Sequence, residues 1–356
     1  MSAEQLTVVK VLFHVPFDVL QRANGGKTVF FKTKEYLERA GVQVDLFDPW
    51  KTQLNTYDLI HCFTMQSTDM WDFAKASGLR LAVTPISWYG VYVTLRSRVK
   101  RWIKRQFRSR IHCPLHEYWW EECFSWPDMF FPQSEEQARQ LRTAFSVQAG
   151  RCLAVPHGVD DRFADADATP FLKKYEVKDF VLSVGRFEPR KNQLSLVRAL
   201  KGTGLQMVFI GSPHSPRFNS YFQQCVDEAG RSARFITDID HDSPMLESAY
   251  AAARVFVLPS LLEYPGLVAL EAGMAGCNVA VTEVGVARDY LGSHARYLDP
   301  YSLRSIRETV LDCYGIDPTR NSALQDHVKK HFRWEKVILG NIEGYSRILG
   351  RGSEGN

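Results

Sequence analysis

Cysteine is scarce in this 356-residue sequence, which contains seven cysteines and no CxxC pair. An odd number of widely spaced cysteines is typical of reduced thiols in the cytosol and argues against a disulfide framework or a zinc site. Long apolar runs are also missing, because no stretch approaches the ~20 residues that a membrane span requires. The opening MSAEQLTVVK lacks the basic and apolar segments of a secretory leader. We therefore expect a cytoplasmic protein that is at most peripheral on the inner face of the cell membrane.

Strong net charge, short-period repeats and low-complexity segments are absent as well. The formal net charge is only +4, so the overall balance does not favour nucleic-acid binding. Hydrophobic residues make up 45% and charged residues 24% of the chain, as in ordinary globular proteins. Because a single hydrophobic core rarely grows past roughly 250–300 residues, the length predicts two domains.

Short apolar runs alternate with longer helical patterns along the whole chain. Runs such as FVLSV and VFVLP are apolar on both faces, as buried parallel strands are. In the first half we expect strands at residues 8–14, 42–47, 59–63, 81–84, 129–131 and 152–155. In the second half we expect strands at residues 180–184, 205–210, 234–236, 255–258 and 278–282. The alternation predicts an α/β protein with two doubly wound, Rossmann-like parallel sheets.

The boundary between the two domains is expected in the polar, acidic segment 157–179, which has no clear strand pattern. We therefore place an N-terminal domain at residues 1–165 and a C-terminal domain at residues 175–330. Residues 331–356 form a last helix and a tail.

The strongest motif is PSLLEYPGLVALEAGMAGCNVAV, in which a strand, a turn and a helix follow one another. The turn contains Glu263, and Glu271 lies about one turn inside the helix. The backbone amides of Gly266, Leu267 and Val268 are free at the helix start, where the helix dipole also favours an anion. A carboxylate before the helix can reach sugar hydroxyls, and one inside it can reach a ribose diol. Either glutamate alone would be an ordinary surface charge, but the pair at such a junction indicates a binding site.

A second motif, VLSVGRFEPRKNQLSLVRAL, places cations beside a buried strand. Gly185 permits a close backbone approach, and Arg186 and Lys191 flank the turn that precedes a helix. Cations at a helix start are electrostatically unfavourable on their own account, so they suggest an anionic ligand rather than a solvated basic loop. An arginine fork and a lysine point charge can neutralise a diphosphate leaving group as its charge grows.

Two weaker patterns complete the set. Gly25 and Gly26 follow the loop after the first strand and precede a helix, where their amides can approach a phosphate, although a glycine pair more often marks a plain turn. The GxGxxG dinucleotide fingerprint is absent, which argues against a dehydrogenase. The DxD sequence at Asp238–Asp240 follows a strand of the second domain, and we interpret it as a loop and not a metal site.

Taken together, GRFEPRKN and the Glu263–Glu271 pair resemble the retaining glycosyltransferases of the GT-B fold, family 4, or glycosyl transferases group 1. SAYAAARVFVLPS and TEVGVARDYLG extend the resemblance over most of residues 180–299. NGGKTVFF, YDLIHCFT and PQSEEQARQL in the first half fit more loosely. The terminal HFRWEKV…GYSRIL is similar to the helix that returns to the N-terminal domain in that fold. The resemblance implies two Rossmann-like domains that face a central cleft, with Gly25 and Gly26 approaching the donor phosphates.

The resemblance also implies roles for the second-half residues. Arg186 and Lys191 would bind the diphosphate of a nucleotide-sugar donor, with UDP and GDP both open. Glu271 would hydrogen-bond the ribose, and Glu263 would contact the transferred sugar. Transfer would retain the anomeric configuration by front-face attack, without a metal or other cofactor. The acceptor is expected to be a glycan or a lipid-linked sugar in envelope or extracellular polysaccharide synthesis.

Three positions depart from the family pattern. Pro265 replaces the phenylalanine of the usual Gly-Phe-Gly and has no N–H to offer a sugar. TPISWYG stands where many relatives have a histidine, so residues 87–89 shape that site instead and no catalytic histidine is assigned. His157 stands in place of an asparagine, and we expect it to be structural. These departures keep a non-catalytic glycan- or partner-binding protein open as an alternative. Another enzyme of the same fold, a nucleotide-sugar epimerase or a phosphorylase, is a further alternative. The glutamate spacing disfavours the epimerase, and nothing in the sequence points to the pyridoxal phosphate lysine of a phosphorylase.

The segment TLRSRVKRWIKRQFRSRIHC, residues 94–113, contains eight lysines and arginines. Its apolar residues recur at spacings of three or four and line one helical face. That pattern suits an interfacial helix on an anionic membrane surface, and equally an amphipathic helix packed on its own domain. The aromatic residues of HEYWWEECFSW, residues 116–126, suit sugar stacking, an interface or core packing.

Overall fold

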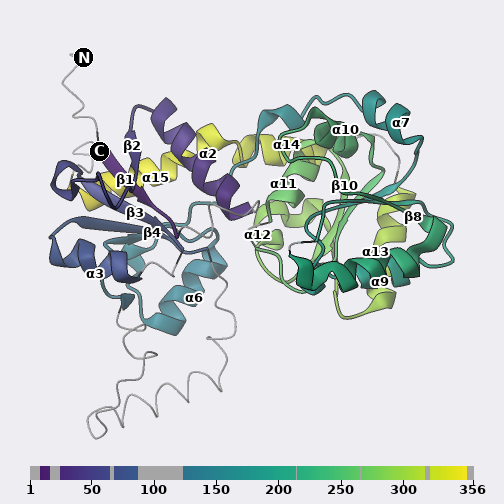
Figure 1. Cartoon of the computed structure of the whole chain (residues 1–356), viewed down its shortest axis with the longest axis horizontal. Helices are drawn as coiled ribbons and strands as arrows, with labels where there is room; N and C mark the ends of the chain where they lie inside the picture. Colours follow the sequence, from purple (N-terminus) through teal and green to yellow (C-terminus); the bar gives the residue numbers. More distant parts are fainter. Residues whose placement is uncertain are drawn as a thin grey trace, which may run out of the picture. The chain divides into compact units, whose positions relative to one another are not determined.

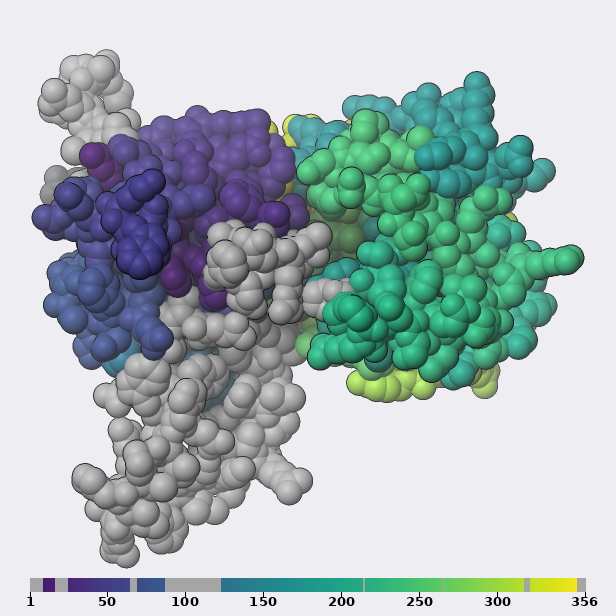
Figure 2. Space-filling view, viewed as in Figure 1, coloured from purple at the N-terminus to yellow at the C-terminus, as the bar shows by residue number. Residues whose placement is uncertain are grey.

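A computed structural model of the chain describes residues 9–16, 25–64, 68–86, 123–213, 215–264, 266–316 and 321–350. The chain divides into two compact units (Figure 1). Unit 1 comprises Met1–His157 together with Trp334–Asn356, and unit 2 comprises Gly158–Arg333. In the space-filling view, the purple and blue surface belongs to unit 1 and the green surface to unit 2 (Figure 2).

Unit 1 is built on a five-stranded parallel sheet with the order β2-β1-β3-β4-β5. This is one of the two common doubly wound orders. Its strands are β1 (Lys10–His14), β2 (Gln43–Leu46), β3 (Leu59–Phe63), β4 (Arg80–Thr84) and β5 (Met129–Phe130). Its helices are α2 (Gly25–Arg39), α3 (Thr68–Ala76), α6 (Glu135–Phe145) and α15 (Trp334–Ile348), with short 3-10 turns at Leu54–Thr56 and Ala149–Arg151. The central strand β3 is buried along its whole length, which explains its unbroken apolar character.

Helices cover both faces of this sheet. Trp71 of α3 and Leu141 and Phe145 of α6 pack with one face of the strands in a common hydrophobic core. On the opposite face α2 and α15 lie against each other, and the rings of Tyr36 and Trp334 stack with centroids 5.9 Å apart. The C-terminal helix therefore returns to the N-terminal domain, as the resemblance implied.

A buried histidine fixes α15 to the sheet of unit 1. The Nδ1 atom of His61 lies 2.6 Å from the hydroxyl of Tyr345 in α15, and its Nε2 atom lies 2.8 Å from Oγ1 of Thr84 in β4. The ring also stacks on Phe63, with centroids 4.4 Å apart. Because both ring nitrogens have partners, the polar group is buried without an unsatisfied hydrogen bond.

Unit 2 is built on a six-stranded parallel sheet with the order β11-β10-β9-β6-β7-β8. Its strands are β6 (Val181–Val184), β7 (Met207–Ile210), β8 (Ala233–Ile236), β9 (Val255–Leu258), β10 (Asn278–Thr282) and β11 (Arg296–Leu298). Its helices are α7 (Thr169–Tyr175), α8 (Gln193–Leu200), α9 (Asn219–Ala229), α10 (Pro244–Ala252), α11 (Leu267–Met274), α12 (Ala287–Leu291), α13 (Leu303–Gly315) and α14 (Ser322–His331). Short 3-10 turns lie at Asp161–Phe163, Pro189–Lys191, Pro216–Phe218, Gly230–Ser232 and Gly292–His294.

The order of strands in unit 2 locates a topological switch point. Strands β6, β7 and β8 follow one another toward one edge, and β9, β10 and β11 follow one another toward the other edge. Helices α8, α9 and α13 pack on one face of the sheet, and α10, α11 and α14 lie on the other (Figure 1). The direction in which successive strands are added to the sheet reverses between β6 and β9. Ligands of open α/β sheets bind beyond the carboxyl ends of strands at such a point.

Two strand expectations need correction. Residues 152–155 do not form a strand, because only Cys152 makes an isolated bridge, to Phe130. The amide of Val155 donates to the carbonyl of Pro132, but a proline has no N–H with which to continue the ladder. The three-residue strand β11 was missed, because so short an edge strand carries almost no periodic signal.

The division between the units lies earlier than the expected end of the first domain at residue 165. The segment that follows His157 belongs to unit 2. There Phe163 is buried against the ring of Tyr250, with centroids 5.5 Å apart. The acidic composition of the segment concealed this apolar contact. Among the described residues, no helix is both long and apolar enough to cross a membrane.

Burial of histidines predicts that unit 1 loses stability on acidification. Burial lowers the pKa of His14 to about 4 and the pKa values of His61 and His157 to about 3. In the unfolded chain these groups titrate near 6.5. Between about pH 6.5 and pH 4 the unfolded chain therefore binds protons that the folded unit does not bind. Each group then lowers the free energy of unfolding by up to about 1.4 kcal/mol per pH unit as the pH falls.

We expect His61→Asn to reduce this pH dependence. The measurement is the free energy of unfolding of unit 1 from denaturant titrations between pH 7 and pH 4.5. His331→Asn, at an exposed position of unit 2, is the control and should keep the slope of the wild type. A His61→Asn protein with the wild-type slope would show that His61 is not held neutral in the folded state.

Candidate active site

Two loops of unit 2 converge at the switch point. One follows β6 and contains residues 185–192, and the other follows β9 and contains residues 259–266. Because β6 and β9 are hydrogen-bonded neighbours, the carboxyl ends of both strands lie side by side. The structure thereby brings together the two motifs that the sequence singled out.

Lys191 and Glu263 form a buried ion pair between these loops. The Nζ atom of Lys191 lies 2.8 Å from Oε2 and 3.0 Å from Oε1 of Glu263. The side chains are only 11% and 3% exposed. Burial raises the pKa of the Glu263 carboxyl, but the charge and hydrogen bonds of Lys191, with smaller contributions from Arg190 and Ser260, outweigh burial and lower the pKa overall. The carboxylate is therefore ionised at neutral pH.

The backbone of Glu263 is held by the segment after β10. Its amide donates to the carbonyl of Val284 at 3.0 Å, and its carbonyl accepts from the amide of Val286 at 3.3 Å. Gly285 lies between these two contacts with a φ of +116°, and a Cβ atom there would lie 2.0 Å from the carbonyl oxygen of Glu263. Only glycine permits this approach. Gly285 was not singled out from the sequence, where a lone glycine after a strand carries no distinctive signal.

Arg190 and Asn192 tie the two loops together. The guanidinium of Arg190 donates to the carbonyl of Leu262 at 2.7 Å and to Glu188 at 2.7 Å. The side-chain amide of Asn192, itself in the left-handed region with a φ of 59°, donates to the carbonyls of Pro259 and Pro300 at 3.1 and 2.8 Å. Arg190 and Asn192 therefore hold the two loops beside each other, so that Lys191 lies next to Glu263.

Arg186 and Gly185 lie at the start of the same loop. Nη2 of Arg186 lies 3.7 Å from Oε1 of Glu188, and its backbone carbonyl accepts a hydrogen bond from Gln193 at 2.9 Å. Its side chain is about one third exposed, so the guanidinium remains accessible. Gly185 has a φ of 149° and donates its amide to Ile210 at 2.9 Å.

The loop after β9 ends at the N-terminus of α11. Gly266 is the residue before the helix and has a φ of 78°. Leu267 and Val268 occupy the first turn, where backbone amides have no acceptor within the helix. This terminus therefore provides donors and a favourable dipole for an anion. Pro265, noted as a departure from the family, lies outside the described residues.

Glu271 is a buried carboxylate whose two oxygens both accept hydrogen bonds. Its Oε1 atom lies 2.8 Å from Nε2 of His241, and its Oε2 atom lies 2.8 Å from the hydroxyl of Tyr250. The residue is 4% exposed. Hydrogen bonding to Glu271 raises the pKa of His241 against the opposing effect of burial. Neither His241 nor Tyr250 was singled out, because each lies far from Glu271 in the sequence and neither spacing marks it as a partner of that carboxylate.

Arg162 holds the loop that carries His241. Its guanidinium donates to the carbonyl of His241 at 2.8 Å and to the carboxylate of Glu247 in α10 at 2.8 Å. Arg162, in the segment after the unit boundary, therefore helps to hold His241 against Glu271.

The structure also describes other residues that the sequence singled out. Gly25 and Gly26 do not precede a helix but form the first turn of α2 in unit 1. Asp238–Asp240 lies in an irregular segment after β8, as expected of a loop. Among the described residues no group of three or more histidine, cysteine or acidic side chains is arranged to hold a metal ion. Residues 87–89 and 94–113 lie outside the described part of the chain.

Two further expectations concern the core of unit 1. His157 is buried, in keeping with a structural role. The described part of HEYWWEECFSW contains Phe124, which packs face to face on Phe145 with ring centroids 3.8 Å apart. This aromatic ring therefore belongs to the core and is not available to stack on a sugar.

Comparison with known proteins finds a family that is similar to most of unit 2. Residues 166–322 match the family described as Glycosyl transferases group 1. The chain is 30% identical over 194 residues to the O-antigen chain mannosyltransferase B of Escherichia coli, which covers 51% of this chain and 50% of the relative. It is 34% identical over 165 residues to the D-inositol 3-phosphate glycosyltransferase of Mycolicibacterium paratuberculosis, which covers 44% of this chain and 37% of the relative. The chain thus spans half or less of the length of these relatives.

Solved structures share the fold of the whole chain. Sucrose-phosphate synthase from Thermosynechococcus elongatus has a TM-score of 0.75 at 19% identity and covers 97% of this chain and 100% of its own. Alr3699/HepE of Anabaena in complex with UDP and glucose has a TM-score of 0.70 at 15% identity, over 95% of this chain and 100% of its own. The two parallel-sheet units define a GT-B protein. Within this fold, residues 166–322 match the family model of the glycosyl transferases group 1.

A double-mutant cycle tests the buried ion pair. Lys191→Met and Glu263→Gln should each lower the free energy of unfolding of unit 2 by about 3 kcal/mol, because each leaves a buried charge without its partner. The double variant should lose less than the sum, with a coupling energy of about 1–3 kcal/mol. Denaturant titration measures all four proteins. Strictly additive losses would show that the two side chains do not interact in solution.

Gly285→Ala tests the backbone contact beside Glu263. Gly292→Ala is the matched control, since Gly292 also has a positive φ, 53°, but nothing within 4 Å of an added Cβ. We expect about 1 kcal/mol of destabilisation for the control, from backbone strain alone. Gly285→Ala should cost at least about 2 kcal/mol, because strain is joined by a clash. Equal losses in thermal or denaturant unfolding would contradict the close approach.

Proposed function

We propose that this protein is a glycosyltransferase that moves a sugar from a nucleotide diphosphate sugar to a glycan or lipid-linked acceptor. The observation that carries the proposal is the convergence of Lys191, Glu263 and the first turn of α11 at the switch point of unit 2. The match of residues 166–322 to the glycosyl transferases group 1 supports the same activity.

The proposed donor diphosphate lies between the cations of the first loop and the amides of α11. A lysine ammonium has three protons. Even with Lys191 bound to both oxygens of Glu263, a proton remains to meet a phosphate oxygen. Arg186 adds a second, more exposed cation. As the bond to the sugar breaks, negative charge grows on the diphosphate, and these fixed donors stabilise it without reorganisation.

Glu271 is proposed to bind the ribose of the donor. Each carboxylate oxygen can accept more than one hydrogen bond. The contacts to His241 and Tyr250 therefore orient the carboxylate while leaving acceptor capacity for a vicinal diol. His241 acts as a positioning residue in this account, because it fixes Glu271 from the loop after β8.

Glu263 is proposed to contact the transferred sugar. Lys191 keeps its carboxylate ionised, and the backbone contacts around Gly285 fix its position. An ionised carboxylate beside the leaving diphosphate stabilises the positive charge that develops on the sugar ring. Retention of the anomeric configuration is part of the proposal and is supported by the family resemblance.

The acceptor side of the proposal rests on the relatives. One relative is named an O-antigen chain mannosyltransferase and another a D-inositol 3-phosphate glycosyltransferase. The first name refers to a sugar polymer and the second to a phosphorylated polyol. A role in envelope or extracellular polysaccharide synthesis is the version we favour. Acceptor binding by unit 1 is proposed on the family pattern. Membrane attachment through residues 94–113 and the approach of Gly25 and Gly26 to the phosphates stay predictions.

A thermal-shift screen against UDP, GDP, ADP and their common sugar conjugates tests donor binding. A ligand at one hundred times its dissociation constant should stabilise the protein by about 2.7 kcal/mol. We expect one nucleoside diphosphate to produce this shift, and Lys191→Ala to abolish it. Lys201→Ala is the matched control. Lys201 is an exposed lysine of the same unit and forms an ion pair with Glu228.

Turnover with the identified donor separates catalysis from mere binding. Lys191→Ala should lower kcat about 100-fold, by analogy with the loss of one charge-stabilising donor at other active sites. Glu271→Gln should instead act mainly through donor affinity. A nucleotide that binds normally but supports no transfer to any glycan acceptor would favour the non-catalytic alternative. The absence of any nucleotide shift would reject the proposed donor site itself.

A further inference from the structure

His241 lies in the loop after β8, between two carboxylates. Its Nε2 atom lies 2.8 Å from Oε1 of Glu271 in α11, and its Nδ1 atom lies 3.3 Å from Oδ1 of Asp242 on the same loop. An ionised carboxylate only accepts hydrogen bonds, and a neutral imidazole has a single N–H to donate. The imidazolium form, in which both ring nitrogens donate, is therefore the form that satisfies both contacts.

Arg162 is a cation that packs against His241, and carboxylates balance its charge. Its guanidinium donates to the backbone carbonyl of His241 at 2.8 Å. It also lies 2.8 Å from the carboxylate of Glu247 in α10 and 3.7 Å from the carboxylate of Asp160. The ring of Phe163, from the same segment as Arg162, is uncharged, and its centroid lies 6.5 Å from that of His241. The repulsion that Arg162 exerts on a charged imidazole is thereby reduced.

The sum of these neighbours favours the charged imidazole. Hydrogen bonding to Glu271 raises the pKa of His241, with a further rise from Asp242, and these effects outweigh burial and the charge of Arg162, which lower it. The ordinary value is about 6.5, so His241 loses its proton above that pH. The side chain is 35% exposed, which lets the ring exchange protons with solvent.

The charge on His241 acts on Glu271. That residue is 4% exposed, and its second carboxylate oxygen accepts from the hydroxyl of Tyr250 in α10 at 2.8 Å. Burial raises the pKa of Tyr250 well above its usual range, so its hydroxyl stays a neutral donor. A charge-assisted hydrogen bond is roughly twice as strong as a neutral one. The imidazolium therefore holds the carboxylate more firmly than the neutral ring can.

We propose that His241 is a proton-dependent positioning residue, which in its imidazolium form orients Glu271 for the ribose hydroxyls of a nucleotide sugar. Loss of its proton weakens donor binding. The inference rests on the proposed role of Glu271 in binding the ribose. Because linkage is reciprocal, a donor that binds the protonated form more tightly also draws a proton from solvent onto His241. The proposal therefore specifies a proton balance as well as a pH profile.

Isothermal titration of the full chain with UDP-glucose, GDP-mannose and ADP-glucose tests this inference. Nucleotide sugars suit the test because both of their phosphates are diesters, whereas a phosphate monoester titrates near a pH of about 6. We expect the dissociation constant of the probe that binds to rise at least about fivefold between pH 6.0 and pH 8.5, as for a typical coupling between sites. At pH 7.5, titrations in buffers of different ionisation enthalpy should show uptake of a fraction of a proton.

His241→Gln and Asp242→Asn separate protonation from a purely structural role. Glutamine keeps an N–H donor for Glu271 but does not titrate, so His241→Gln should bind the probe without pH dependence and without proton uptake. Asp242 is 94% exposed, so its substitution should leave the fold intact. Asp242→Asn removes one of the two carboxylates that favour the imidazolium, and the rise in dissociation constant should therefore move to lower pH.

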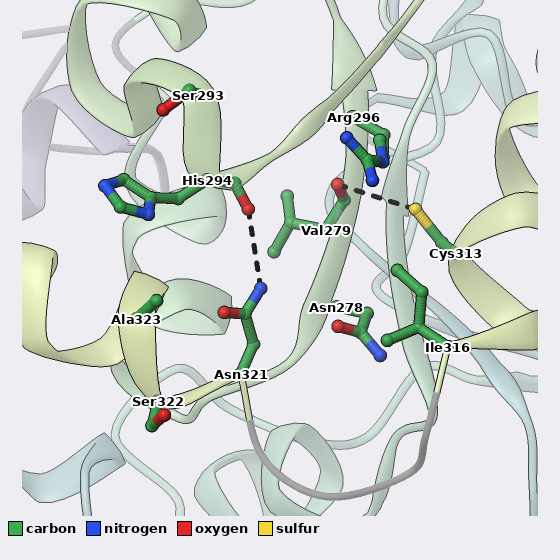
Figure 3. A pocket seen from close by; sticks show the side chains of 10 residues that line it. All are labelled: Asn278, Val279, Ser293, His294, Arg296, Cys313, Ile316, Asn321, Ser322 and Ala323. Atoms are coloured by element: carbon green, nitrogen blue, oxygen red, sulfur yellow. Dashed lines mark hydrogen bonds between the residues drawn. The ribbon is translucent and has the colours of Figure 1, made fainter.

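His294→Gln is the matched control, at another partly buried histidine of unit 2. His294 precedes β11, at the opposite ends of the parallel strands from the loop after β8. Its backbone carbonyl accepts a hydrogen bond from the side-chain amide of Asn321 at 3.4 Å (Figure 3). This variant should keep the pH dependence and the proton uptake of the wild type.

The outcomes distinguish this inference from the proposed function. A probe that binds with the same dissociation constant at every pH, or a His241→Gln protein that takes up protons as the wild type does, overturns the inference and leaves the donor site in place. A pH profile of Asp242→Asn that coincides with the wild-type profile also overturns it. A protein that binds none of the three probes at any pH overturns the donor site and the inference together.

Discussion

The candidate active site depends on one interaction, the buried ion pair between Lys191 and Glu263. A lysine and a glutamate removed from water are each costly, and only their mutual contact makes the burial tolerable. Because one residue follows β6 and the other follows β9, the pair also fixes the two loops on either side of the switch point. The surrounding contacts serve this geometry: Arg190 and Asn192 join the loops, and Gly285 lets the backbone of Glu263 approach the segment after β10.

The pair has a chemical consequence as well as a structural one. It keeps Glu263 ionised at a place where burial alone would favour the neutral acid. It also leaves Lys191 with a proton to offer a phosphate oxygen at the N-terminus of α11. A neighbouring carboxylate, Glu271, is oriented by a separate set of contacts to His241 and Tyr250. The site thus combines one carboxylate paired to a fixed cation with another held by hydrogen bonds, which is why the proposal gives them different roles.

Much of the fold could be predicted from the sequence, because buried parallel strands are short runs that are apolar on both faces. Strands β3, β9 and β10 begin and end where their apolar patterns do. The edge strand β11 and the false strand at residues 152–155 could not be resolved, since a short run carries too little pattern and a proline interrupts the ladder. The motifs identified Lys191, Glu263 and Glu271 as candidates, but not that Lys191 and Glu263 contact each other 72 positions apart. His241 and Tyr250 were missed, because their significance comes only from the contact with Glu271 that the fold creates.

The most direct test of the central claim is a crystal structure of the protein with the nucleoside diphosphate that the thermal-shift screen selects. The account predicts a diphosphate oxygen within hydrogen-bond distance of Nζ of Lys191 and the first-turn amides of α11, with the ribose hydroxyls on Glu271. A nucleotide bound elsewhere on unit 2, with Lys191 still engaged only by Glu263, would contradict the assignment of the ion pair to the donor site.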